Sequence, residues 1–310
     1  MNIAIIGAGF SGSYLAHKLH AKGHDVSLFE KSRGVGGRMA TRYMENTQVN
    51  HGCNTIQTTV KEFQSFCDSM VEKNLLEKKE QNAYTATSIN GMLKYLTKDI
   101  HLERNTLITS INYDNQQYTL KDNNNYAYKG FDFLILTIPS AQILNLDFEI
   151  DKNLADKLAQ VHYDSVATLV LTGKNIAELD KIQLSKMKHL KKLYAPKDNT
   201  YVIQMDRDFS KKYRHLNKNS ITPYIVQEIQ RVVPNFKLYN YEYFSHLWKY
   251  GLTSKTLDLP YVYKQQENYA ICGDWLMGDS VEDAFMSVEN FMTLESDFLE
   301  SNFMHLKELV

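Results

Sequence analysis

The residues with the clearest chemical meaning are three glycines near the start of the chain. They lie in the run Gly7-Ala8-Gly9-Phe10-Ser11-Gly12. This Gly-x-Gly-x-x-Gly run follows the apolar segment 2–6 and precedes a segment with helical spacing of leucines. In such a turn the first glycine permits a tight bend, the second lets backbone approach a diphosphate, and the third lets helix pack on strand. Because the N–H groups at the helix start would face the phosphates, the run predicts a dinucleotide-binding turn.

An acidic residue, Glu30, ends the next apolar segment, about twenty residues after the glycines. Its carboxylate is placed to accept hydrogen bonds from the ribose hydroxyls of an adenosine. NAD and FAD both bind to this unit, so a second signal has to separate them.

The segment that follows Glu30 supplies that signal. It reads Lys-Ser-Arg-Gly-Val-Gly-Gly-Arg-Met-Ala-Thr-Arg over residues 31–42. A glycine pair followed by arginine, just past the acidic residue, is typical of FAD proteins. The pair would let backbone pass close to the diphosphate, and Arg38 offers a planar fork of donors to its oxygens. A glycine turn with solvated arginines would explain neither the spacing nor the pair. We assign Lys31, Gly37, Arg38 and Met39 to the cofactor site.

A third signal lies near the end of the chain, at Gly273-Asp274 after the apolar residues 269–272. An acidic side chain at a strand end can accept from the ribityl hydroxyls of FAD. N–H groups at the start of the helix expected from Val281 onward can face the electron-rich end of the flavin. An isolated Gly-Asp pair is more often a turn, so its value comes from the first two signals. We add Asp283 and Ala284 to the predicted cofactor site on the same grounds.

The elements that must position these residues follow from the apolar pattern. Segments 2–6 and 25–29 are short apolar runs, as in strands buried on both faces of a parallel sheet, and a helix over 11–22 connects them. This unit is doubly wound in type. Alternating runs with Asn- and Asp-rich turns predict an antiparallel meander over 106–137 that returns to a buried strand at 133–137.

Composition bounds the remaining possibilities. The 310 residues carry 35 Lys and Arg against 36 Asp and Glu, a formal charge of −1, so no field favours nucleic acid. The three cysteines, Cys53, Cys67 and Cys272, lack metal-ligand or redox-pair spacing, so no metal site is predicted. The longest apolar stretch, 131–139, is far shorter than the roughly 20 residues of a membrane helix. With no export signal evident, we expect a cytoplasmic protein without a nucleic-acid or membrane partner.

Segments 30–42 and 272–287 together resemble the bacterial renalase-like flavoproteins, which are relatives of the amine-oxidase group. Weaker resemblance runs through 137–139 and 246–250. The resemblance implies an α/β fold: an FAD-binding Rossmann-like domain of the p-hydroxybenzoate-hydroxylase type with an inserted α+β substrate domain. We place the FAD domain at 1–50, 97–139 and 260–310, and the substrate domain at 51–96 and 140–259.

The resemblance also implies a reaction. Hydride would pass from an isomeric dihydro-NAD(P) to FAD, and dioxygen would reoxidise the flavin to give hydrogen peroxide. The substrate is then a dinucleotide, or in the alternative of a flavin amine oxidase an amine. A third interpretation is a non-catalytic FAD-binding protein that acts through a partner.

The chain departs from the family in one segment. Where the family commonly reads Asp-His-Gly-Ala-Gln-Tyr-Phe, residues 50–56 read Asn-His-Gly-Cys-Asn-Thr-Ile. Gly52, which we assign to the cofactor site, is the same residue as in the family. Asn54 keeps the amide of the family's Gln on a side chain one methylene shorter. The segment is expected to pass the flavin ring, so the departure bears on substrate choice rather than on FAD binding.

No catalytic residue is assigned, because hydride transfer from a dihydropyridine needs no general base. Candidates remain, each with a plain structural alternative. His51 is either a base or a hydrogen-bonded structural group, and Asn54 is the altered family position. Trp248, Tyr250 and Trp275 form either an aromatic slot for a planar ring or part of the core.

Overall fold

The computed structural model describes residues 1–45, 47–173, 176, 179, 181–197, 199–217 and 219–293. The chain divides into two compact units. Unit 1 comprises Met1–Gly37, Thr55–His162 and Lys255–Val310, and unit 2 comprises Arg38–Asn54 and Tyr163–Ser254.

These units differ from the predicted division. Residues 55–96 and 140–162, which we placed in the substrate domain, pack in unit 1, and Arg38–Asn54 packs in unit 2 although most of it was placed with the FAD domain. The difference arises because contacts over long sequence separations, which the sequence pattern does not show, decide where a segment packs. Which segments bind cofactor and substrate stays a prediction.

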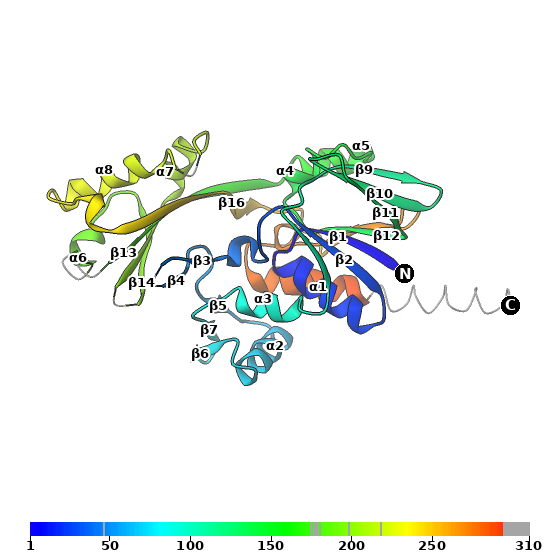
Figure 1. Cartoon of the computed structure of the whole chain (residues 1–310), viewed down its shortest axis with the longest axis horizontal. Coiled ribbons are helices and arrows are strands. Elements are labelled where there is room, and N and C mark those ends of the chain that lie inside the picture. Colours follow the sequence, from blue (N-terminus) through cyan, green and yellow to red (C-terminus); the bar gives the residue numbers. More distant parts are fainter. Residues whose placement is uncertain are drawn as a thin grey trace. The chain divides into compact units, whose positions relative to one another are not determined.

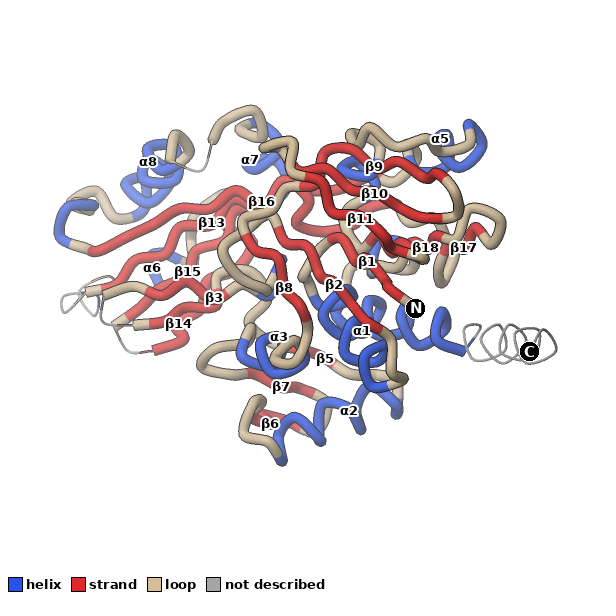
Figure 2. Tube along the Cα trace, turned by 45° about the vertical axis from the view of Figure 1, so that its right-hand side comes forward, coloured by secondary structure: helices blue, strands red, loops and turns tan. Residues whose placement is uncertain are grey.

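Unit 1 is built on a sheet whose described strands follow the order β17-β18-β12-β1-β2-β8. Their bounds are β1 (Asn2–Ile6), β2 (Asp25–Glu30), β8 (His101–Arg104), β12 (Phe133–Leu136), β17 (Val262–Lys264) and β18 (Tyr269–Ile271). All neighbours pair in parallel except the edge strand β17, and β8, β2 and β1 lie side by side in Figure 2. The side chains of Ile3–Ile6 are buried, as expected of a strand covered on both faces. The predicted α/β fold with a Rossmann-like parallel sheet is confirmed.

Helices cover this sheet. Helix α1 (Phe10–Ala21) packs against β1, β2 and the short helix α3 (Gly91–Leu96), as Figure 1 shows. Helix α2 (Lys61–Glu72) and the helical residues 281–293 meet α1 through a group of aromatic rings. The rings in mutual contact are Phe10, Tyr14, Phe63, Phe66 and Phe285. The predicted C-terminal helix is thus observed to residue 293, and its remainder lies outside the described residues.

The rest of unit 1 is antiparallel. The predicted meander is present as β9 (Ile108–Asp114), β10 (Gln117–Asp122) and β11 (Ala127–Phe131). A small sheet joins β5 (Ile56–Gln57), β7 (Ala83–Thr85) and β6 (Glu77–Glu80). Short helices are α4 (Ser140–Ile143), α5 (Lys152–Leu158) and the 3-10 turn η4 (Asp274–Leu276).

Unit 2 has its own sheet and its own core. The described strands run in the order β14-β15-β13-β16, with bounds β13 (His162–Thr172), β14 (Leu190–Lys197), β15 (Thr200–Met205) and β16 (Glu242–Lys255). A hairpin of β3 (Thr41–Tyr43) and β4 (Gln48–Asn50) follows the 3-10 turn η1 (Gly37–Met39). Helices α6 (Lys181–Leu184), α7 (Arg207–Lys212) and α8 (Thr222–Val232), with the 3-10 turn η3 (Leu238–Asn240), complete the unit. Leu169 of β13, Ile203 of β15 and Ile225 of α8 belong to one buried cluster.

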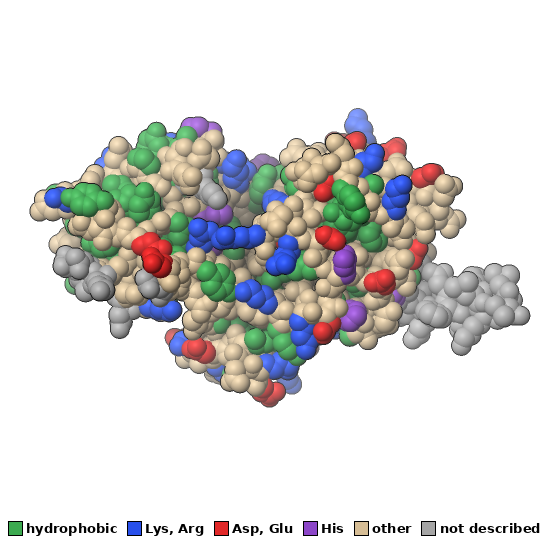
Figure 3. Space-filling view, in the orientation of Figure 1, with side chains coloured by type: hydrophobic (Ala, Val, Ile, Leu, Met, Phe, Trp, Pro, Cys, Tyr) green, Lys and Arg blue, Asp and Glu red, His purple; other side chains and the backbone are tan. Residues whose placement is uncertain are grey.

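No helix within the described ranges is both long and apolar enough to cross a membrane. On the face of unit 1 seen in Figure 3, acidic and basic side chains are interspersed. This distribution agrees with the formal charge of −1.

Candidate cofactor site

The glycine turn connects β1 to α1, and two of its glycines have no room for a side chain. Gly7 has a φ of +107°, and a Cβ there would lie 2.9 Å from the side chains of Thr137 and Ile138. A Cβ on Gly12 would lie only 1.9 Å from the Gly7 carbonyl oxygen. The first and third glycines of the motif are therefore required by the fold itself, as the sequence predicted.

The middle glycine differs from these two. A Cβ on Gly9 would meet no described atom within 4 Å, although Gly9 is the N-cap residue of α1. The turn is thus open on the side where a side chain would otherwise stand, at the end of the helix whose N–H groups favour an anion. This cradle fits a diphosphate.

Thr137, directly after β12, holds the turn in place and was not among the predicted site residues. Its single hydroxyl hydrogen is shared between the carbonyl oxygens of Ile6 and Gly7, which lie 3.0 Å and 2.8 Å from Oγ1. The sequence signals for it are a hydroxyl residue directly after a buried apolar run and the weaker family resemblance of residues 137–139.

The position of the turn in the sheet is that of a ligand crevice. From β1 the chain moves to β2 on one side, while β12 lies on the other. Ligands of open α/β sheets bind at such a switch point, beyond the carboxyl ends of the strands. Glu30 ends β2 and Asp274 follows β18, so both acidic residues lie at the carboxyl ends of strands that run parallel to β1.

The Glu30 carboxylate is buried, with 7% of the residue exposed, and it organises the turn. Its Oε2 accepts from the Ala8 N–H at 3.0 Å, and its Oε1 accepts from the Ser32 N–H at 2.7 Å. An ionised carboxylate has about four acceptor positions, so it keeps capacity for ligand hydroxyls.

The second glycine loop packs on the first through backbone alone. Gly36 N–H donates to the Ala8 carbonyl at 2.9 Å, and a Cβ on Gly37, whose φ is +52°, would lie 3.2 Å from Gly9 Cα. The structure therefore brings together the two glycine segments that the sequence singled out. Lys31 is exposed and its Nζ donates to Gln142 Oε1 of α4 at 3.0 Å.

Three further predicted cofactor residues, Arg38, Met39 and Gly52, lie in unit 2. Met39 is buried and Arg38 is half-buried. Arg38 and Gly52 meet through their backbones: a Cβ on Gly52 would lie 2.2 Å from the Arg38 carbonyl oxygen, which accepts from the Cys53 N–H at 2.8 Å. Gly52 is thus a close-approach glycine.

His51 stands in a group of rings in unit 2. Its ring centroid lies 5.1 Å from Phe244, 5.3 Å from His246 and 5.0 Å from Trp248. These three partners alternate along β16 and so point to one face of the strand. Burial, together with the nearby His246 and Arg42, lowers the pKa of His51 to about 3. With a pKa this far below neutral pH the imidazole is a weak proton acceptor, which favours the structural interpretation over a general base.

The other candidate residues do not belong to the group of rings around His51. The ring centroids of Tyr250 and Tyr163 lie 5.2 Å apart, and the Arg214 guanidinium lies over the Tyr250 ring. Asn54 Oδ1 accepts from Lys192 Nζ at 2.9 Å. Trp275 is 1% exposed, and its Nε1 donates to the Ile138 carbonyl at 3.2 Å, which makes it a core residue of unit 1.

The C-terminal signal forms two local structures. Asp274 is 4% exposed at the start of η4, and the preceding Gly273 N–H donates to Ser287 Oγ at 3.0 Å. Asp283 accepts from the Ser280 N–H at 2.9 Å, and Ser280 Oγ accepts in turn from the Asp283 N–H at 3.0 Å. Asp283 therefore closes a reciprocal cap on the helical residues 281–293.

Two neighbours of Asp283 have packing roles. Ala284, like Phe10 of the glycine turn, has a buried side chain, so only the backbone of these two predicted residues is placed to reach a cofactor. Glu282, which was not among the predicted site residues, accepts from the N–H groups of Thr59 and Val60, the two residues that directly precede α2.

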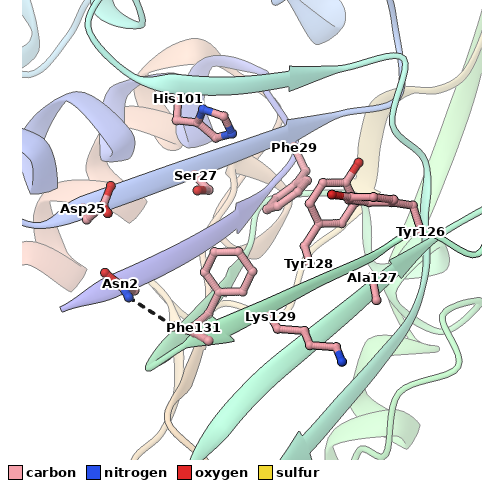
Figure 4. Close-up of a pocket in the computed structure, with 11 residues that line it drawn as sticks. Asn2, Asp25, Ser27, Phe29, His101, Tyr126, Ala127, Tyr128, Lys129 and Phe131 are labelled. Atoms are coloured by element: carbon pink, nitrogen blue, oxygen red, sulfur yellow. Dashed lines mark hydrogen bonds between the residues drawn. The ribbon is translucent and has the colours of Figure 1, made fainter.

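A separate groove of about 350 Å³ contains none of the predicted site residues (Figure 4). Asn2, Asp25 and His101, which begin β1, β2 and β8, contribute to its lining. The rings of Phe29, Tyr128 and Phe131 also line it. It includes the amino ends of the strands, and is therefore not the crevice where an open α/β sheet binds nucleotides.

Comparison with known proteins supports the assignment of the N-terminal segment. Residues 5–70 match the family described as NAD(P)-binding Rossmann-like domain. Aplysianin-A from Aplysia kurodai is 53% identical over 47 residues, which are 15% of this chain and 8% of that protein. The 4,4'-diapophytoene desaturase (4,4'-diaponeurosporene-forming) of Staphylococcus haemolyticus (strain JCSC1435) is 55% identical over 40 residues, 13% of this chain and 8% of that protein. The matches thus span less than a tenth of either relative.

One solved structure is similar over nearly the whole chain. A protein from Exiguobacterium sp. 255-15, assigned as a protoporphyrinogen oxidase, aligns with a TM-score of 0.67 at 11% identity, covering 96% of this chain and 99% of that chain. At this identity the likeness concerns the fold. A Rossmann-like dinucleotide-binding domain is therefore established, and the rest of the chain has a known fold around it.

Proposed function

We propose that this protein is an FAD-dependent oxidoreductase of the renalase-like type. It would take hydride from a small dihydropyridine such as an isomeric dihydro-NAD(P), with dioxygen as the final acceptor and hydrogen peroxide as the product. The observation that carries the proposal is the packing of the second glycine loop onto the glycine turn at the switch point of the sheet. A site that binds only NAD needs the first glycine turn but not the second loop. In an FAD site, both loops would contact the diphosphate.

The residues present fit that cofactor. The open side at Gly9 and the N-terminus of α1 would receive the diphosphate, and the Glu30 carboxylate would accept from the adenosine ribose. Arg38, which directly follows Gly37 in the chain, would donate to the diphosphate oxygens. Asp274 would accept from the ribityl chain.

When bound, FAD supplies a ring that accepts hydride and is reoxidised by dioxygen. The protein then contributes cofactor binding, orientation of the donor and exclusion of competing reactions. The neutral, buried His51 agrees with a reaction that needs no proton transfer from the protein. The rings on β16 around Trp248 are our candidates for the surface that orients a planar donor.

The test is an anaerobic reduction screen followed by admission of air. Dihydro-NAD reduced at the non-metabolic ring positions should bleach the flavin much faster than ordinary NADH or a simple amine, and air should restore the colour with release of peroxide. Orientation is the physical reason, since hydride transfer requires the donor carbon within about 3 to 3.5 Å of the acceptor. Equal rates with normal and isomeric dinucleotides would remove this argument. Faster bleaching by an amine would identify an amine oxidase, and no bleaching by any donor would favour a non-catalytic FAD-binding protein.

A further inference from the structure

Three consecutive peptide carbonyls, those of residues 50–52, are held by two side chains of the unit 2 sheet. Tyr194 of β14 donates through its hydroxyl to the Asn50 carbonyl oxygen at 2.6 Å. Gln204 of β15 donates through Nε2 to the carbonyl oxygens of His51 at 3.3 Å and Gly52 at 3.1 Å. This use of one amide nitrogen for two acceptors is possible because a glutamine NH₂ carries two hydrogens.

The opposite side of the same turn rests on the backbone of Arg38. Gly52 has no room for a Cβ beside the Arg38 carbonyl oxygen, and the Cys53 N–H donates to that oxygen at 2.8 Å. The turn 51–53 is therefore fixed between the Gln204 amide and the Arg38 peptide. Gln204 is only 8% exposed. If its amide were lost, the carbonyl oxygens of His51 and Gly52 would lose this donor, and this side of the turn would no longer be held.

We propose that Gln204 is a positioning residue for FAD binding, acting through the 51–53 turn to fix the backbone of Arg38. This inference rests on the proposed function, because it takes Arg38 to bind the diphosphate. Residue 38 directly follows the glycine pair, so its backbone direction decides where the guanidinium fork can reach. Sequence reasoning did not select Gln204, which is far from Arg38 along the chain.

A double-mutant cycle separates this role from a general loss of stability. The FAD dissociation constant is measured by titrating full-length apoprotein with FAD, in the parent, Gln204→Met, Arg38→Ala and the double variant. Gln204→Met should raise the dissociation constant by about tenfold in the parent background and by less than about twofold in the Arg38→Ala background, because the two changes remove the same contact. Urea unfolding of the four apoproteins reports stability separately.

Gln230→Met is the matched control, since Gln230 Nε2 also donates to one backbone carbonyl in unit 2, that of Phe236, at 3.2 Å. It should leave FAD affinity unchanged. Tyr194→Phe provides a second variant that keeps the ring and removes only the donor to Asn50. It should weaken FAD binding less than Gln204→Met does. In the Arg38→Ala background it should not weaken FAD binding.

Each outcome is decisive. A Gln204→Met variant that binds FAD as tightly as the parent, or loses the same factor in both backgrounds, overturns the positioning role. If Gln204→Met does not fold, an unchanged affinity in Tyr194→Phe overturns it. A parent protein that binds no FAD contradicts the proposed function instead.

Discussion

The buried imidazole of His51 makes the stability of the protein depend on pH in a defined range. His51 is 6% exposed, and burial lowers its pKa to about 3 in the folded chain. In the unfolded chain a histidine titrates at about 6.5. Between these two values the unfolded chain binds a proton that the folded chain does not, so the free energy of unfolding falls as pH falls. Above about 6.5 both forms are neutral and His51 contributes no pH dependence.

The size of the effect follows from the two pKa values. The slope approaches about 1.4 kcal/mol per pH unit below pH 6.5, which integrates to a loss of about 2 kcal/mol between pH 7 and pH 5. His51→Phe removes the titrating group and keeps a ring to pack against Trp248. The parent should therefore lose about 2 kcal/mol more than this variant over the same interval.

Urea unfolding at about pH 7 and about pH 5 measures the difference, with the free energy taken by linear extrapolation. Tryptophan fluorescence is a suitable signal because Trp248 lies against His51. His215→Gln is the control: His215 is exposed, and the variant should follow the parent. Parallel pH dependences for the parent and His51→Phe would refute the assignment of a buried, neutral imidazole.

Substitutions at three further positions, Gly12, Arg38 and Asp283, test the site. Gly12→Ala should abolish FAD binding, since its Cβ would lie 1.9 Å from the Gly7 carbonyl oxygen, whereas Gly91→Ala, with no described atom within 4 Å of its Cβ, should bind FAD like the parent in the same titration. Arg38→Ala should weaken FAD binding by roughly 1.5 to 3 kcal/mol, and Arg38→Lys should restore only part of it because an ammonium lacks the planar fork; equal affinity in all three proteins would mean that Arg38 does not bind the diphosphate. Asp283→Ala should lower the free energy of unfolding by about 0.5 to 2 kcal/mol through loss of the helix cap, and an unchanged urea midpoint would contradict that role.

The glycine turn and the two strands beside it, β1 and β2, could be predicted from the sequence because their requirements are local. Gly7 is fixed by its positive φ, and Gly12 by its close approach to the Gly7 carbonyl oxygen. Glu30 is likewise specified by its place at the end of β2. The meander could be predicted for the same reason, since its strands are neighbours along the chain and Asn-rich turns separate them.

Unit 2 could not be predicted at this level, because it packs the hairpin of β3 and β4 against strands far along the chain, as in the buried cluster of Val49, Val170 and Val202. Gln204 reaches Gly52 across 152 positions, and no local pattern marks either residue as a partner. The role of His51 also required the structure, since the pKa of an imidazole depends on burial that the sequence does not show. Trp275 illustrates an alternative that the sequence left open: of a ligand slot and a core position, the structure places it in the core.

We propose that the two glycine loops, Glu30 and Asp274 hold FAD without a covalent bond. The most direct test is to denature the purified protein, remove the precipitate and identify the flavin in the supernatant by chromatography. We expect a yellow protein that releases intact FAD in about a one-to-one ratio to chain, in line with a single dinucleotide-binding unit. FMN in the supernatant, flavin that stays with the precipitated chain, or a protein that contains no flavin and takes up none from added FAD would contradict it.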